Sequence, residues 1–201
     1  HDLAENGGPM LPLGSLTQRI AEIGKRVFGT SDLVEIRKRL RSESSNHFST
    51  RDELLAYTTA AIERARTSVP QWFNQLPQAV VVIKPVPEYQ EQSSTARYMP
   101  ASDDRKVPGT YFVNLYQPEK QSKGETESVA FHETYPGHHL QIALAQEQIS
   151  AHPLLRYIGN SGFSEGWARY SETLAAEMGL YSSELNTLEM LSGVPSGMVV
   201  D

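Results

Sequence analysis

The sequence predicts a predominantly helical α+β fold in which a small β-sheet precedes a second group of helices. Three observations support this prediction. Apolar residues recur every three or four positions in both flanks of the chain, which is typical of amphipathic helices. Seven of the twelve prolines lie between Pro70 and Pro118, where long helices are therefore disfavoured. The same middle part contains two runs of β-forming residues.

The 201 residues are long enough to bury a core as one domain. Composition divides this domain into three parts. Residues 1–78 form a helical part, residues 79–118 contain strands and loops, and residues 119–201 form a second helical part.

Three helices are predicted in the first part. An apolar repeat from Leu13 to Val27 predicts the first helix, and Asp32 is a suitable N-cap for the second. Thr50 and Glu53 have the spacing of a capping box, so the third helix should begin there.

Two strands are predicted in the middle part. The apolar run Ala79–Ile83 is typical of a buried strand, and Thr110–Tyr116 follows a Pro-Gly turn. We expect the polar segment Glu88–Lys106 between them to be a loop. From about Gly124 onward, the pattern predicts two long helices and a shorter one.

Charge and hydropathy exclude several classes of protein. Apolar residues make up 39% of the chain and charged residues 21%, and the formal net charge is −6. No run approaches the ~18 apolar residues of a membrane span, so no transmembrane segment is predicted. We interpret the basic run Arg37–Arg41 as a solvated helix face, and the acidic chain argues against a nucleic-acid partner.

The chain contains no cysteine, which excludes disulfides, a thiolate nucleophile and cysteine-ligated zinc. Any bound metal must therefore have nitrogen and oxygen ligands. The chain begins with His1 rather than Met, so we expect a processed or excised product.

A cluster of histidines points to a metal site. His132-Glu133 resembles the start of the zinc-peptidase helix His-Glu-x-x-His, in which two histidines four positions apart face one metal. Here Pro136 stands where the second histidine should be. On an unbroken helix, at about 100° per residue, His138 would lie roughly 240° around the axis from His132.

Pro136 and Gly137 offer a solution, because proline removes a helical amide and glycine permits unusual dihedral angles. A two-residue bulge would return His138 to the side of the helix that carries His132. We therefore favour His132 and His138 as ligands, with His139 as an alternative. A surface turn with incidental histidines is the competing interpretation.

A two-histidine zinc site needs a third protein ligand, and Glu165 on a following helix is the candidate. Alternatively, Glu165 forms an ion pair with Arg169 one turn later. The same helix carries an apolar stripe that we expect to belong to the core. Its members are Phe163, Trp167, Tyr170, Leu174 and Met178.

Three motifs resemble the bacterial family known as domain of unknown function 885. They are the Pro-Gly-Thr-Tyr strand from Pro108, His-Glu-x-x-Pro-Gly-His-His from His132, and Glu-Gly-Trp-Ala-x-Tyr-x-Glu from Glu165. The resemblance is specific over about Tyr98–Tyr181. Members of that family are often labelled lipoproteins and grouped with the zincin metallopeptidases, and the third motif is similar to the glutamate-ligand helix of gluzincins.

This resemblance implies a zincin-like catalytic core that binds zinc. It implies His132, His138 and Glu165 as zinc ligands and Glu133 as general base. It also suggests a periplasmic or membrane-anchored lipoprotein, although the cytoplasm stays open as a compartment. Because family members are much longer, we expect this chain to be the catalytic middle of a larger helical protein. The end, Met190–Asp201, lacks the arginine-bearing helix expected there.

The leading hypothesis is a zinc-dependent metallopeptidase acting on a peptide or small amide. The alternatives are an inactive binding or structural domain with the same fold, and a metal-dependent hydrolase of non-peptide amides or esters. Tyr98, Arg105 or Tyr111 is expected to stabilise the oxyanion. The strand Tyr111–Leu115 is expected to bind an extended peptide at its edge, with help from Asn114. No oligomeric state is predicted.

Overall fold

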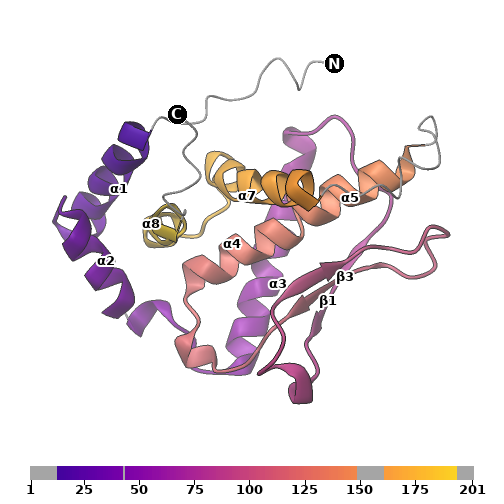
Figure 1. Cartoon of the computed structure of the whole chain (residues 1–201), viewed down its shortest axis with the longest axis horizontal. Coiled ribbons are helices and arrows are strands. Elements are labelled where there is room, and N and C mark those ends of the chain that lie inside the picture. Colours follow the sequence, from indigo (N-terminus) through magenta and orange to yellow (C-terminus); the bar gives the residue numbers. More distant parts are fainter. Residues whose placement is uncertain (1–12, 43, 149–160, 194–201) are drawn as a thin grey trace.

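The structure is a computed structural model that describes residues 13–42, 44–148 and 161–193. It confirms the predominantly helical α+β fold with a small sheet (Figure 1). The longer described helices are α1 (Leu13–Phe28), α2 (Leu33–Ser42), α3 (Arg51–Ser68), α4 (Lys123–Glu133), α5 (His138–Glu147), α7 (Ser161–Glu177) and α8 (Glu184–Gly193). The strands are β1 (Val81–Pro85), β2 (Arg97–Met99) and β3 (Gly109–Val113). Short 3-10 turns lie at Ser44–Asn46, Val69–Gln71, Glu88–Gln90 and Pro118–Lys120.

Helix α4 is the central element of the fold, since it packs against α3, α7 and α8. Helices α1 and α2 cover α8 at one end of the molecule, and the sheet lies at the other end (Figure 1). The last turn of α4 therefore lies between the sheet and α7, where Phe131 is fully buried and His132 and Glu133 are partly buried.

The sheet has the strand order β1-β3-β2, with β1 parallel and β2 antiparallel to β3. Two predicted strands are present, although the first begins at Val81 rather than Ala79 and is an edge strand rather than a buried one. β2 lies inside the segment that we expected to be a loop. This strand is only three residues long, and it acquires its conformation by pairing with β3. Tyr98, for example, lies opposite Tyr111.

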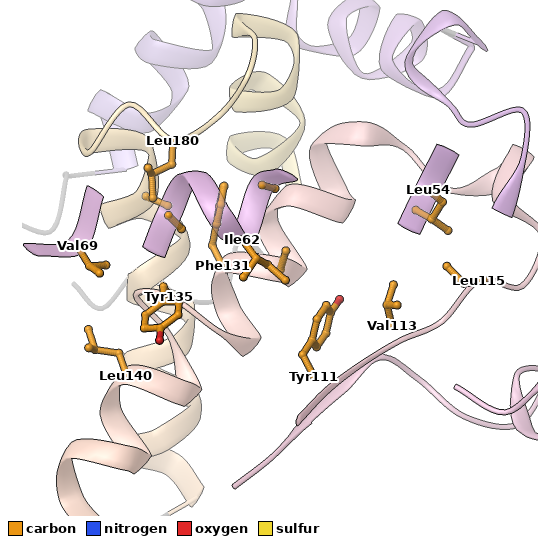
Figure 2. Close-up of a cluster of buried hydrophobic side chains, with 14 of the residues drawn as sticks. Leu54, Ile62, Val69, Tyr111, Val113, Leu115, Phe131, Tyr135, Leu140 and Leu180 are labelled. Carbon is orange, nitrogen blue, oxygen red and sulfur yellow. The ribbon is translucent and has the colours of Figure 1, made fainter. Parts of the chain in front are cut away.

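Two large apolar clusters form most of the core of the described residues, beside a small one of Ala79, Ala101 and Ala143. The larger one lies between the sheet and helices α3, α4 and α5, and includes Leu54, Ile62, Tyr111, Phe131 and Leu140 (Figure 2). The second joins α1, α2 and α8 through Ile20, Ile23, Ile36, Leu188 and Leu191. Both clusters contact α8 or its preceding turn, so the two ends of the molecule are held together.

The helix starts predicted for the first part are confirmed. The side-chain oxygen of Asp32 accepts hydrogen bonds from the first backbone amides of α2, and that of Thr50 accepts one from Glu53. The capping box differs in one respect. The Glu53 carboxylate accepts from the amide of Ser49 instead of Thr50.

The predicted bulge between His132 and His138 is a complete break in the helix. α4 ends at Glu133 and α5 starts at His138, so the last part has four described helices instead of the three expected. The amide of Gly137 donates to the carbonyl oxygen of Phe131 (3.0 Å), which turns the chain back against α4. A Cβ atom on residue 137 would lie 1.9 Å from the carbonyl oxygen of His132, so only glycine fits.

Replacement of this glycine should therefore destabilise the fold. We expect Gly137→Ala to lower the free energy of unfolding by about 1–3 kcal/mol or more, because backbone atoms must move to admit the methyl group. Gly166→Ala is the matched control: its Cβ would meet no atom within 4 Å, and alanine in a helix interior gains about 0.5–1 kcal/mol. Urea unfolding measures both changes. An unchanged midpoint for Gly137→Ala would contradict the close approach.

Candidate metal centre

Three helix ends meet at one point and bring His132, His138 and Glu165 together. One ligand atom from each lies within 4.8 Å of the others. The Nε2 atom of His132 is 3.5 Å from the Glu165 carboxylate, and that of His138 is 3.4 Å from it. The break at Gly137 thus brings His138 beside His132, as the predicted bulge would have done, but it does so by starting a new helix.

The other ring nitrogen of each histidine has a protein partner. His132 Nδ1 is 2.8 Å from the Glu172 carboxylate, and His138 Nδ1 is 3.2 Å from the Ser164 hydroxyl. With a proton on Nδ1 in both rings, each Nε2 presents its lone pair to the same point. Such outer partners fix ring orientation and raise the basicity of metal ligands.

Glu172 is itself held firmly. It is buried and accepts hydrogen bonds from Ser128 on α4 (2.7 Å) and Arg169 on its own helix (3.1 Å). Arg169 therefore pairs with Glu172, and the alternative ion pair with Glu165 is not formed. No role was predicted for Glu172 from the sequence. Glu172 lies seven residues after Glu165, two helical turns further on the same face, and this spacing was the feature of the sequence that pointed to a role at the same site.

His139, the alternative ligand, lies apart from the cluster. It is fully buried, and its two ring nitrogens contact the hydroxyls of Tyr98 (2.8 Å) and Tyr135 (3.1 Å). Burial lowers the pKa of His139 to about 4, so the ring is neutral at physiological pH. Both nitrogens are engaged, which leaves His139 no atom for a metal.

Burial also lowers the pKa of His138, and the neighbouring His132 adds to this effect, whereas Glu165 opposes it. The neutral form is the one that binds metals, so no proton has to be removed from His138 at neutral pH. The cluster is therefore electrostatically suited to a cation.

Glu133 lies beside the three candidate ligands. One carboxylate oxygen accepts a hydrogen bond from the backbone amide of Tyr98 on β2 (2.8 Å). Burial raises the pKa of Glu133, with a further contribution from the charge of Glu165, while His132 and the Tyr98 amide lower it. A carboxylate with a raised pKa is better suited to accept a proton.

The apolar stripe on α7 is only partly in the core. Leu174 is buried, but Phe163 is 60% exposed and Tyr170 39% exposed, so the prediction was wrong for the first half of the helix. Trp167 is half-buried, and its indole N–H donates to the carbonyl of Pro136 (2.9 Å). This bond ties α7, and with it Glu165, to the connection between α4 and α5.

The four predicted substrate-binding residues lie in different surroundings. Tyr111 lines the groove that contains His132 and Glu133. Tyr98 uses its hydroxyl to contact His139, and Arg105 donates to Gln78 in an outer loop.

The prediction of peptide binding at the edge of Tyr111–Leu115 was wrong. β3 is the central strand and is paired on both sides, so its edges are not available. The Asn114 side-chain amide donates to the carbonyl oxygens of Glu91 and Ser94, which fixes the preceding loop. The strand next to Glu133 at the margin of the sheet is β2.

Comparison with known proteins agrees with the predicted resemblance. Residues 13–194 match the family of bacterial proteins of unknown function DUF885. The chain belongs to this family. It is similar to a solved structure described as "the putative lipoprotein from Colwellia psychrerythraea", with 28% identity and a TM-score of 0.78.

The match to that structure covers 89% of this chain and 32% of the other, so this DUF885 chain spans about a third of the Colwellia protein. No curated protein matches the chain. Among the described helices, none is long and apolar enough to cross a membrane.

If these ligands hold a metal, Glu172 should tune its affinity. We expect Glu172→Gln to weaken zinc binding about 10- to 100-fold, because the neutral amide supports the His132 ring less well. Glu177→Gln, on the exposed end of the same helix, should leave affinity unchanged. Titration calorimetry with zinc measures both constants. Equal affinity for the two variants would refute this role of Glu172.

Proposed function

We propose that this chain carries the catalytic centre of a zinc-dependent hydrolase, specifically a metallopeptidase, with Glu133 as general base. The observation that carries the proposal is the convergence of two histidine Nε2 atoms and one carboxylate within 4.8 Å, with Glu133 directly beside them. Glu133 follows His132 in the sequence, lines the same groove and interacts electrostatically with both His132 and Glu165, which supports a base close to a metal bound at this point.

The donor atoms fit zinc. In a tetrahedral shell with bonds of about 2.1 Å, ligand atoms lie about 3.4 Å apart. One oxygen of the Glu165 carboxylate lies 3.5 Å from His132 Nε2 and the other lies 3.4 Å from His138 Nε2, both close to this value, while the three candidate ligand atoms as a set lie within 4.8 Å of one another. Two histidines and a glutamate with one open position is a ligand set of catalytic zinc sites. Bound here, zinc would supply a Lewis acid and lower the pKa of a water molecule towards ~7.

Glu133 would take the proton of the attacking water and return it to the leaving nitrogen. The Tyr98 amide holds one carboxylate oxygen, which orients the other for this transfer. Of the three predicted oxyanion donors, Tyr111 is the one that lines the groove beside Glu133, so we assign the role to its hydroxyl.

We place the proposed activity in a protein longer than this chain, because the chain covers 32% of the Colwellia structure. The description of that neighbour as a lipoprotein supports a membrane-anchored or periplasmic location. Experiments on activity should therefore use the full-length protein.

We expect Glu133→Gln to reduce peptide hydrolysis by about 10²- to 10⁴-fold, the usual contribution of a general base, while zinc content stays the same. Glu177→Gln serves as the control with normal activity. Hydrolysis of a mixed peptide pool, followed by mass spectrometry, together with metal analysis of each variant, tests both statements. Undiminished hydrolysis by Glu133→Gln would exclude this mechanism.

A parallel screen of amide and ester substrates separates the peptidase from other hydrolases. Cleavage of esters but not of any peptide would overturn the substrate assignment while leaving the site intact. Zinc binding without turnover of any substrate class would instead favour an inactive binding domain.

A further inference from the structure

A groove of about 1280 Å³ leads away from the candidate metal centre. It follows one face of α4, where Glu125, Val129 and His132 are spaced by three or four residues. One wall is formed by residues 94–96 and by the end of β3, and the other by α2, α7 and α8. The groove is larger than the roughly 300–1,000 Å³ of small-molecule pockets, which favours an extended ligand.

The far end of this groove is basic. Arg37 and Arg41 lie one turn apart on α2, on the same side of the helix, and both line the groove. Lys120, just before α4, lines it as well. The backbone of His47 bridges to Ser122, which places the segment after α2 beside the first turn of α4.

Within the described part of the chain, Arg37, Arg41 and Lys120 form no ion pair. Their neighbour Arg39, by contrast, is bound to Glu35 at 2.9 Å. The charges of these groove residues are therefore available to a ligand.

Carboxylates at this end do not neutralise the three cations. Glu189 is turned towards the side-chain amide of Asn46 and the backbone amide of Gly124, both at 2.9 Å. Glu125 is the other carboxylate in this part of the lining, and Glu119 lies in a small adjoining hollow. The three cations thus outnumber the two carboxylates of the groove end.

We propose that this basic end binds an anionic group of the substrate, which in a peptide is a carboxylate several residues from the cleaved bond. The proposal rests on the proposed peptidase function for the position of that bond. From Glu133 to Lys123, α4 rises about 15 Å, at 1.5 Å per residue. An extended peptide covers this distance with four or five residues of about 3.3 Å each. The carboxylate is that of an acidic side chain or of the peptide's own C-terminus.

Binding can be measured without turnover by using the zinc-loaded Glu133→Gln variant of the full-length protein. The probes are alanine-based decapeptides with an uncharged N-terminal fluorophore (dansyl), one glutamate placed at each position in turn and an amidated C-terminus. Matched peptides carry glutamine instead, and one further peptide has a free C-terminal carboxylate. This set separates the two sources of the charge.

We expect one or two glutamate positions, or the free C-terminus, to bind about tenfold more tightly than the neutral peptide. Adding Arg37→Gln and Arg41→Gln should abolish that preference and leave neutral peptides unaffected, because the removed charges attract only an anionic group. Arg37→Lys with Arg41→Lys should retain it. Lys38→Gln is the matched control on the same helix, because Lys38 does not line the groove.

The preference should also weaken as salt is raised from 0.05 to 0.5 M, an experimental range across which the Debye length shortens from roughly 14 to 4 Å. Equal affinity for acidic and neutral peptides, or a preference that survives the double glutamine substitution, overturns the proposal. The measurement does not depend on hydrolysis. Anion binding at the basic end can therefore be disproved while the peptidase proposal stands, and the peptidase proposal can be disproved while anion binding stands.

Discussion

The contact between Gly137 and the backbone of α4 is the constraint on which the site depends. Without a Cβ atom, residue 137 can approach the carbonyl of His132 and send the chain back, so that α5 starts with His138 next to His132. The indole of Trp167 then binds the carbonyl of the adjacent Pro136 and fixes the first turns of α7 against this connection. Glu165 is positioned by the same bond. One short backbone contact therefore decides where His138 lies relative to His132, and the bond from Trp167 ties the helix that carries Glu165 to the same connection.

This placement is useful only because α4 itself cannot shift. Glu127, fully buried on α4, accepts a hydrogen bond from Arg64 of α3 (2.6 Å) and another from Asn186 of α8 (2.8 Å). Arg64, whose side chain is 35% exposed, is the charged partner of this buried carboxylate, and its loss would leave Glu127 paired with neutral donors. Ser128, the next residue, binds Glu172 and so connects this support to the His132 ring. The helix is held from α3, α7 and α8 before any metal binds.

Features with a local cause were predictable from the sequence, and features with a tertiary cause were not. Asp32 and Thr50 start helices through bonds to amides two or three residues away, so their spacing was sufficient. The Pro-Gly break suggested that His132 and His138 face one point, and the family resemblance added Glu165; that the three hold a metal stays a prediction. β2 was missed because three residues gain their conformation only from pairing with β3. His139 has the same chemistry as His138, and only its contacts with Tyr98 on β2 and with Tyr135 remove it from the ligand set.

Net charge was a poor guide to the surface of the groove. The chain carries a formal charge of −6, yet the end of the groove near α2 presents three cations without ion pairs among the described residues. At the other end, Glu133 and Glu172 concentrate negative charge around the two histidines, which suits a metal cation. Interactions between exposed charges are largely screened beyond a Debye length. A ligand in the groove therefore responds to the nearby side chains rather than to the total charge of the molecule. A groove with carboxylates at one end and arginines at the other can distinguish the two directions of an extended peptide. The charges alone are sufficient for this distinction, without a pocket for a particular side chain.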